Sequence, residues 1–169
     1  EVVAEPSPKA VELAAVFRQS ELGLRAEQAL RSGREFDFLF DLEGTLIRGT
    51  IDLWFEDAAG TTLVDYKTGR PGGEQLDQYR LQLQIYAGAL ATIGVRQPLR
   101  AFIFLLNENR AINVATGEEG RRQVLATLDR FIVAGKQGDF PMRAGRTCDY
   151  CPFWKNVCPG RDSETGGEG

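Results

Sequence analysis

The sequence predicts an α/β fold with a central mixed sheet and helices on both faces. Residues 34–68 contain three stretches in which apolar and polar residues alternate, as in consecutive antiparallel strands. Residues 99–106 form an apolar run interrupted only by Arg100, which is typical of a central strand buried on both faces. Helical patterns lie before, between and after these strands. The order α, β-β-β, α, β and a closing helix suits one sheet covered on both sides.

Local signals predict the elements in chain order. Ser7 and Pro8 are an N-cap and a first-turn proline for a helix that runs to about residue 19. A second helical pattern then continues to Ser32 and ends at Gly33. The further predictions are strands at 34–42, 45–57 and 62–68, a helix at 75–94, a strand at 99–106, a short strand at 111–115 and a helix at 117–135.

Two of these helices have an apolar stripe. The expected stripe of the helix at 75–94 consists of Leu76, Tyr79, Leu83, Tyr86, Ala87 and Leu90. The expected inward residues of the last helix are Val124, Leu125, Leu128, Phe131 and Ile132.

Length and composition limit the class of protein. The 169 residues suffice for one sizeable core, here residues 1–159, and the Ser-, Glu- and Gly-rich residues 160–169 are expected to be a disordered acidic tail. The first residue is Glu, so we expect a piece of a longer, cytoplasmic protein; the chain shows neither a signal peptide nor a membrane-spanning run. The chain has no histidine, which excludes Ser-His-Asp and Cys-His catalysis and histidine-ligated zinc within it. The net charge of −4 argues only weakly against a polyanionic ligand.

The central stretch, residues 48–69, has the pattern of a β-hairpin. Alternating residues 49–55 and 62–68 flank the break Asp57-Ala58-Ala59-Gly60. A two-residue turn centred on Ala58-Ala59 fixes the register. The predicted pairs on one apolar face are Ile51–Tyr66, Leu53–Val64 and Phe55–Thr62, and those on the other face are Asp52–Asp65, Trp54–Leu63 and Thr50–Lys67.

This register predicts a cation near the two acids. Directly opposed residues have Cβ atoms about 4.5–5.5 Å apart, and like charges at that distance are destabilising. Lys67 supplies one positive charge, and Mg²⁺ or Mn²⁺ held by Asp52 and Asp65 would supply more. The alternative is a solvent-facing hairpin with one ordinary Asp–Lys pair.

Three motifs in a fixed order resemble one family. Gly49-x-x-Asp52, Asp65-Tyr66-Lys67-Thr68-Gly69 and Gln82-x-x-x-Tyr86 resemble the PD-(D/E)XK nucleases. The likeness is closest to the RecB-type nuclease domains at the C-termini of RecB, AddA and AddB helicase–nucleases, and to their CRISPR-associated exonuclease relatives. It covers about residues 34–159 and implies a restriction-endonuclease-like core.

The resemblance implies a role for each matching residue. Asp52 and Asp65 resemble the family's metal ligands, and the carbonyl of Tyr66 would complete the set. Lys67 resembles the catalytic lysine, which positions or deprotonates the attacking water. Gln82 and Tyr86 resemble the pair that supports the active site and contacts the DNA strand.

The chain also departs from the family. RecB-type domains carry a His, or sometimes a Glu, on a helix upstream of the sheet as a further metal ligand, and no residue here matches it. We expect that helix to lie upstream of Glu1 in the parent protein. Glu35 resembles a recurrent family acid that lines the site, with a surface role as the alternative. The basic candidates for contacting the DNA backbone are Arg48, Arg70, Arg80 and Arg146.

Three cysteines follow the pattern Cys148-x-x-Cys151-x6-Cys158. Closely spaced thiols favour metal binding, but zinc and [4Fe–4S] sites usually take four thiolates. In AddB-like and CRISPR-associated relatives, three C-terminal cysteines join a distant upstream one around a [4Fe–4S] cluster. The resemblance implies the same here, with the fourth ligand outside this chain. The alternatives are three reduced thiols or a zinc substitute.

These features together predict a metal-dependent DNA nuclease domain. Its implied partners are DNA and a helicase domain or helicase subunit, and its implied role is double-strand break repair and recombination. One rival is a non-catalytic module of the same fold that binds DNA or a partner protein. Another is a cysteine-centred metal or redox module with an incidental hairpin.

Overall fold

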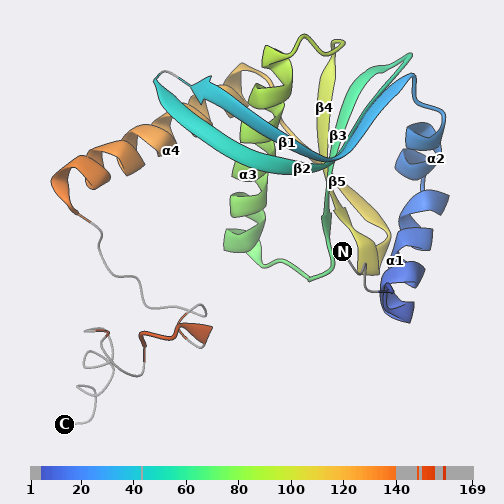
Figure 1. The fold of residues 1–169 in the computed structure, drawn as a ribbon, viewed down its shortest axis with the longest axis horizontal. Coiled ribbons are helices and arrows are strands. Elements are labelled where there is room, and N and C mark those ends of the chain that lie inside the picture. Colours follow the sequence, from blue (N-terminus) through green and yellow to red (C-terminus); the bar gives the residue numbers. More distant parts are fainter. Residues whose placement is uncertain (1–4, 43, 140–147, 149, 155–157, 159–169) are drawn as a thin grey trace. The chain divides into compact units, whose positions relative to one another are not determined.

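The chain forms a five-stranded mixed sheet with helices on both faces (Figure 1). This description rests on a computed structural model that describes residues 5–42, 44–139, 148, 150–154 and 158. The chain divides into two compact units, Glu1–Thr127 and Leu128–Gly169. The first unit contains the whole sheet. Within the described residues, no helix is both long and apolar enough to cross a membrane.

The elements occur close to their predicted positions. In chain order they are α1 (Pro8–Gln19), α2 (Glu21–Glu27), β1 (Arg31–Leu42), β2 (Thr45–Asp57), β3 (Gly60–Lys67), α3 (Gly73–Thr92), β4 (Leu99–Leu105), the 3₁₀ turn η1 (Leu106–Glu108), β5 (Arg110–Val114) and α4 (Glu118–Gln137).

The sheet has the order β1-β2-β3-β4-β5. β1, β2 and β3 pair antiparallel, β3 and β4 pair parallel, and β4 and β5 pair antiparallel. α3 lies in the connection between the two parallel strands, and such a crossover usually contains a helix. The predicted mixed sheet is therefore confirmed, with the 99–106 run as a central strand beside β3.

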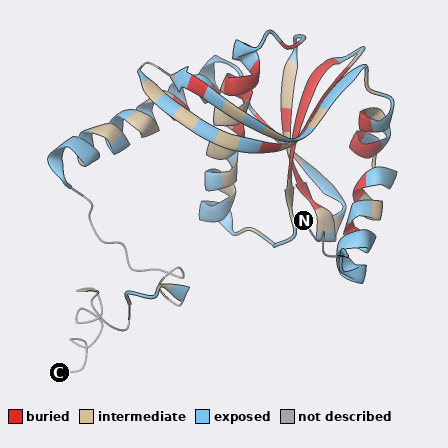
Figure 2. Cartoon of the chain, in the orientation of Figure 1, coloured by how far each residue is buried: buried red, intermediate tan, exposed pale blue. Residues whose placement is uncertain are grey.

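Two hydrophobic clusters lie on opposite faces of the sheet. The α3-side cluster includes Leu83, Ala87 and Leu90 of α3 packed on Leu63 and Ile103. The α1/α2-side cluster consists of Phe17, Leu22, Ala26, Leu53, Phe55, Val64 and Phe104. Figure 2 shows the buried residues concentrated in the middle strands and on the helix faces turned toward them. Burial on both faces explains why β4 is apolar along most of its length.

The predicted boundary between the second helix and the first strand was wrong. α2 ends at Glu27, and β1 begins three residues before the predicted strand. Ser32 and Gly33 are not helical because they pair with Phe55 and Trp54 of β2. A Cβ on Gly33 would lie 2.4 Å from the Trp54 Nε1, so glycine lets the indole pack onto the strand.

The predicted inward face of the last helix was wrong at Phe131. Val124 is buried, whereas Phe131 is 68% exposed.

Gly60, at the end of the β2–β3 turn, offers a stability test. Its φ is +112°, and a Cβ there would lie 2.3 Å from the Pro98 carbonyl oxygen. We expect Gly60→Ala to lower the free energy of unfolding by about 2 kcal/mol or more, because both the backbone and the contact are strained. Gly73→Ala, in open space at the start of α3, should leave stability unchanged or slightly higher. Equal stability of the two variants in urea unfolding would contradict this account.

Candidate active site

The hairpin register is confirmed near its turn. β2 and β3 pair through Asp57–Gly60, Glu56–Thr61, Phe55–Thr62, Trp54–Leu63 and Leu53–Val64. The ladder ends there, so the predicted direct pairs Ile51–Tyr66, Asp52–Asp65 and Thr50–Lys67 are absent from these described strands. Instead the backbone N–H of Tyr66 donates to Oδ2 of Asp52 over 2.8 Å. The side chain of Asp52 takes the place of a backbone acceptor and ends the pairing.

The regular alternation of side chains along β2 is interrupted at Asp52. The prediction that the apolar residues of β2 share one face was therefore wrong. Ile51 lies in the α3-side cluster, whereas Leu53 and Phe55 lie in the α1/α2-side cluster. A regular strand would place all three on one face. On β1, the same interruption coincides with Glu35, whose φ of 45° lies in the left-handed region.

Asp65 is the most deeply buried acid of the site, at 1% exposure. It follows Val64 on β3, and its neighbours on the strand belong to the sheet's core. Its Oδ2 lies 2.6 Å from Nζ of Lys67. Burial raises the pKa of Asp65, the nearby charge of Asp52 raises it further, and Lys67 partly offsets both. The two carboxylates therefore interact, although they are not a ladder pair.

Lys67 has a second contact, with an aromatic ring of α3. Its Nζ lies 4.6 Å from the centroid of the Tyr79 ring, and the Tyr79 hydroxyl accepts a 2.7 Å hydrogen bond from Nε2 of Gln75. The sequence reasoning placed Tyr79 in the buried stripe and missed it as a site residue. The available signal was its position seven residues before Tyr86, on the same side of the helix.

Gln82 and Tyr86 contact each other across one turn of α3. Gln82 Nε2 donates to the Tyr86 hydroxyl over 2.6 Å. Burial raises the pKa of Tyr86, and the charges of Asp65 and Asp52 raise it as well. The α3 pair therefore lies within electrostatic range of both acids.

Gly49 has a packing reason in this arrangement. Tyr86 packs edge-on against Phe38 with ring centroids 5.3 Å apart. A Cβ on Gly49 would lie 2.8 Å from Phe38 and 3.3 Å from Tyr86. Glycine at this position lets the two rings meet over the strand that carries Asp52.

The side chain of Tyr66 lies on the α1/α2 side of the sheet, opposite to α3. Its ring packs edge-on against Phe17 at 4.7 Å. Burial is the main cause that raises its pKa; the charges of Asp52 and Glu35 add to the rise, and Arg34 opposes it. Glu35 is therefore close enough to act on this part of the hairpin, and it is exposed. The carbonyl of Tyr66 as a metal ligand stays a prediction.

The two acids suit a divalent cation by their chemistry. Oδ2 of Asp65 is buried and has no hydrogen-bond partner among the described residues, although it pairs with Lys67. Mg²⁺ is often bound by only one or two carboxylates, with waters and phosphate oxygens filling its other positions. Asp52 and Asp65 fit such a set. No group of three His, Cys, Asp or Glu side chains suited to a metal occurs in the described part of the chain.

The cysteine segment lies in the second unit. Cys148, Cys151 and Cys158 are each partly exposed, and the Cys151 N–H donates to the Cys148 carbonyl over 3.2 Å. The three thiols do not gather into a metal-holding group among the residues described. They are also one thiolate short of the usual four, so this segment alone does not make a complete iron–sulfur site.

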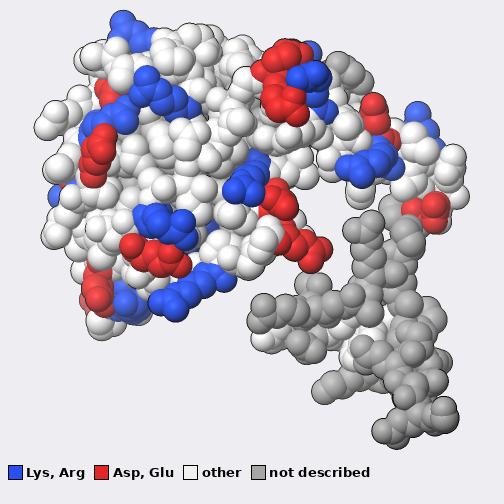
Figure 3. All heavy atoms as spheres, turned by 180° about the vertical axis from the view of Figure 1, so that it is seen from behind, with Lys and Arg blue, Asp and Glu red and all other residues white. Residues whose placement is uncertain are grey.

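The predicted basic residues are spread over the surface. Arg48 is exposed opposite Leu39, Arg70 lies 3.9 Å from Glu108 and Arg80 pairs with Asp77 at 2.8 Å. Arg146 lies outside the described residues. On the face in Figure 3, many basic side chains lie beside acidic ones. Paired charges of this kind form no continuous positive track there.

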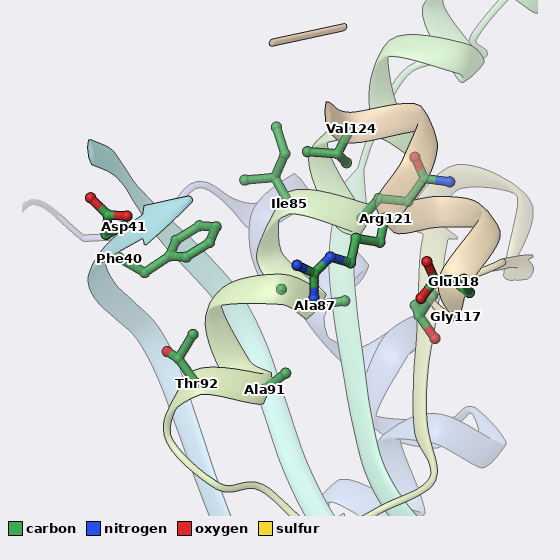
Figure 4. Close-up of a pocket in the computed structure, with 13 residues that line it drawn as sticks. Phe40, Asp41, Ile85, Ala87, Ala91, Thr92, Gly117, Glu118, Arg121 and Val124 are labelled. Atoms are coloured by element: carbon green, nitrogen blue, oxygen red, sulfur yellow. The ribbon is translucent and has the colours of Figure 1, made fainter. Parts of the chain in front are cut away.

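A cavity of about 490 Å³ has neither Asp52 nor Asp65 in its lining. Phe40 and Asp41 at the end of β1 line it together with α3 and the start of α4. Arg121 reaches from α4 toward α3 in Figure 4. None of the predicted site residues lines this cavity.

Comparison with known proteins places this geometry in a family. The family model of the PD-(D/E)XK nuclease superfamily matches residues 5–159. An ATP-dependent helicase/nuclease subunit from Anoxybacillus flavithermus is 32% identical over 104 residues, which cover 56% of this chain and 9% of that protein. The protein of the same name from Desulforudis audaxviator is 37% identical over 103 residues, covering 50% and 8%. The chain thus spans less than a tenth of the length of these relatives.

Among solved structures, the "Putative exonuclease" from Eubacterium rectale superposes with a TM-score of 0.55. The match covers 89% of this chain and 60% of that one at 15% identity, so it shows the fold alone. This likeness agrees with the predicted mixed α/β core. Because the family model matches most of the chain, including the hairpin and the Gln82–Tyr86 pair, the chain belongs to the PD-(D/E)XK nuclease superfamily.

Proposed function

We propose that the chain is a metal-dependent deoxyribonuclease domain that hydrolyses phosphodiester bonds in DNA. The observation that supports this best is the buried carboxylate of Asp65 held 2.6 Å from Lys67. Asp52 is tied to the same hairpin by the Tyr66 N–H. Acids with perturbed pKa values beside a cation are typical of catalytic sites.

Each residue has a role in the proposed reaction. Asp52 and Asp65 would hold Mg²⁺ or Mn²⁺, which supplies an activated water and neutralises charge on the phosphate. Lys67 orients the attacking water and offsets negative charge that develops on the phosphorane. Tyr86, its hydroxyl held by Gln82, closes the α3 side of the site and contacts the DNA strand.

We further propose that the parent protein is a helicase–nuclease that processes double-strand breaks. The support is the likeness to proteins named as ATP-dependent helicase/nuclease subunits. The helicase would then lie in a part of the parent outside this chain, or in a partner protein.

A non-catalytic module of the same fold is the alternative. It would bind DNA or dock a partner without cutting. Retention of both acids and of Lys67 in contact with Asp65 favours catalysis, because a buried carboxylate is costly to keep without a use. A cysteine-centred redox module is a third hypothesis, which predicts that Asp65 is dispensable.

Cleavage of end-labelled single- and double-stranded DNA tests the proposal. We expect cutting with Mn²⁺ or Mg²⁺ and none with EDTA. Asp65→Ala should lower the rate at least about 100-fold, since it removes a metal ligand and leaves Lys67 unpaired. Asp129→Ala, at an exposed position of α4, is the matched control and should cut like the wild type.

Two results would count against the nuclease. Cutting that survives in Asp65→Ala would assign the activity elsewhere, including to the cysteine segment. No cutting by either this chain or the full-length parent would favour the non-catalytic module, whereas cutting by the parent alone would mean that residues outside this chain complete the site.

Asp65→Asn is expected to separate function from stability. Because the pKa of Asp65 is raised in the fold, the unfolded chain loses this proton at lower pH than the folded one. Stability due to Asp65 is therefore highest below about pH 4 and falls as pH rises through the folded pKa. Asp65→Asn should abolish cutting yet gain stability over the wild type between pH 4 and pH 8, measured by urea unfolding in EDTA. Asp129→Asn should show no such gain, and a loss that grows with pH in Asp65→Asn would refute the account.

We propose separately that the cysteines join a fourth thiolate of the parent around a [4Fe–4S] cluster. The support is their spacing and the turn that brings the Cys158 N–H to the Phe153 carbonyl at 3.0 Å. The full-length parent purified anaerobically should be brown and contain iron and sulfide, and Cys151→Ser should lose both. A colourless, iron-free preparation would contradict the proposal.

A further inference from the structure

Lys67 occupies a position with two competing demands. Its Nζ pairs with Oδ2 of Asp65, and that buried oxygen is also the one suited to a cation. A divalent ion on Asp65 would draw the carboxylate charge away from the lysine and repel the ammonium. The lysine side chain is only 20% exposed, so solvent offers limited compensation.

Lys67 also contacts the ring of Tyr79, and this contact would remain when a cation binds Asp65. The ring centroid lies 4.6 Å from Nζ, within the range of a cation–π interaction. A neutral ring attracts the ammonium without adding negative charge that would compete for the metal. A third carboxylate in that place would pair with Lys67 but would also raise the cost of burying charge.

Tyr79 is itself held in place. Nε2 of Gln75, one turn earlier on α3, donates to its hydroxyl over 2.7 Å. The ring is half-buried and packs against the α3-side cluster, as Leu76 does. α3 therefore presents a fixed aromatic face to a lysine that comes from β3.

We infer that Tyr79 is a positioning residue for Lys67: its ring keeps the ammonium at the scissile phosphate when Asp65 binds a cation. This inference rests on the proposed nuclease function. The ring, and not the hydroxyl, does the positioning, because the hydroxyl is directed to Gln75.

The kinetic test compares Tyr79→Leu with Tyr79→Phe in the Mn²⁺ cleavage assay. Tyr79→Leu removes the ring and should lower kcat about 3- to 30-fold with little change in KM, the range expected for a partly desolvated cation–π contact. Tyr79→Phe keeps the ring and should restore most of the loss. Gln78→Leu, at an exposed neighbouring position of α3, controls for the substitution itself.

A spectroscopic test does not depend on activity. The chain has four lysines, at 9, 67, 136 and 155, so the ¹³Cε–¹Hε signals of labelled lysine can be assigned with Lys67→Arg. The ring current of Tyr79 should shift the Lys67 signal upfield, in Tyr79→Phe as in the wild type. In Tyr79→Leu this shift should disappear.

Specific results would overturn the inference. A rise in KM alone in Tyr79→Leu would mean that the ring stacks on DNA, and Tyr79→Phe as slow as Tyr79→Leu would mean that the hydroxyl matters. An unmoved Lys67 signal in Tyr79→Leu would show that the ring does not hold the lysine. A wild-type chain and parent that do not cut would refute the proposed nuclease, and the lysine signal would still test the contact.

Discussion

Burying an ionised carboxylate inside a sheet costs several kcal/mol unless a cation lies beside it, and Asp65 meets that condition through Lys67. Asp65 and Lys67 are two positions apart on β3. Because side chains alternate along a strand, both lie on the same side of the sheet, the side that α3 covers. The pKa of Asp65 is nevertheless raised, which shows that Lys67 does not fully offset burial and the charge of Asp52. The negative charge of Asp65 is therefore only partly compensated by the positive charge of Lys67.

The neighbouring strands accommodate this carboxylate by leaving regular geometry. The β2–β3 ladder ends before Asp52, and the Asp52 side chain accepts the Tyr66 N–H that a backbone carbonyl would otherwise take. Side chains change faces at this point, beside the left-handed backbone of Glu35. A non-glycine residue in that region costs about 1–3 kcal/mol, and such strain tends to occur at functional sites.

Aromatic rings of α3 form the wall of the site opposite the strands. Tyr86 packs on Phe38 over Gly49, and Tyr79 faces Lys67. Both rings are partly buried and add no charge to this part of the molecule.

The relatives named as helicase/nuclease subunits share sequence with this chain, while the solved structure from Eubacterium rectale shares its fold.

Local sequence signals are sufficient for most of the strands, the mixed sheet and the hairpin register next to the turn. Alternation sets the faces of a strand, and the Asp57–Gly60 turn sets the pairing of the nearest five residue pairs. The candidate site residues were singled out from the motifs, and the structure brings their side chains to one region of the sheet and α3. They are Asp52, Asp65, Lys67, Gln82 and Tyr86.

The places where regular geometry stops depend on tertiary contacts instead. The face change at Asp52 and the early start of β1 result from how distant segments meet, which no local pattern encodes. The same holds for Tyr79: its helical spacing indicates an ordinary core residue, and its contact with Lys67 exists because α3 packs back across β3. Such a contact belongs to two elements at once, so neither segment shows it alone.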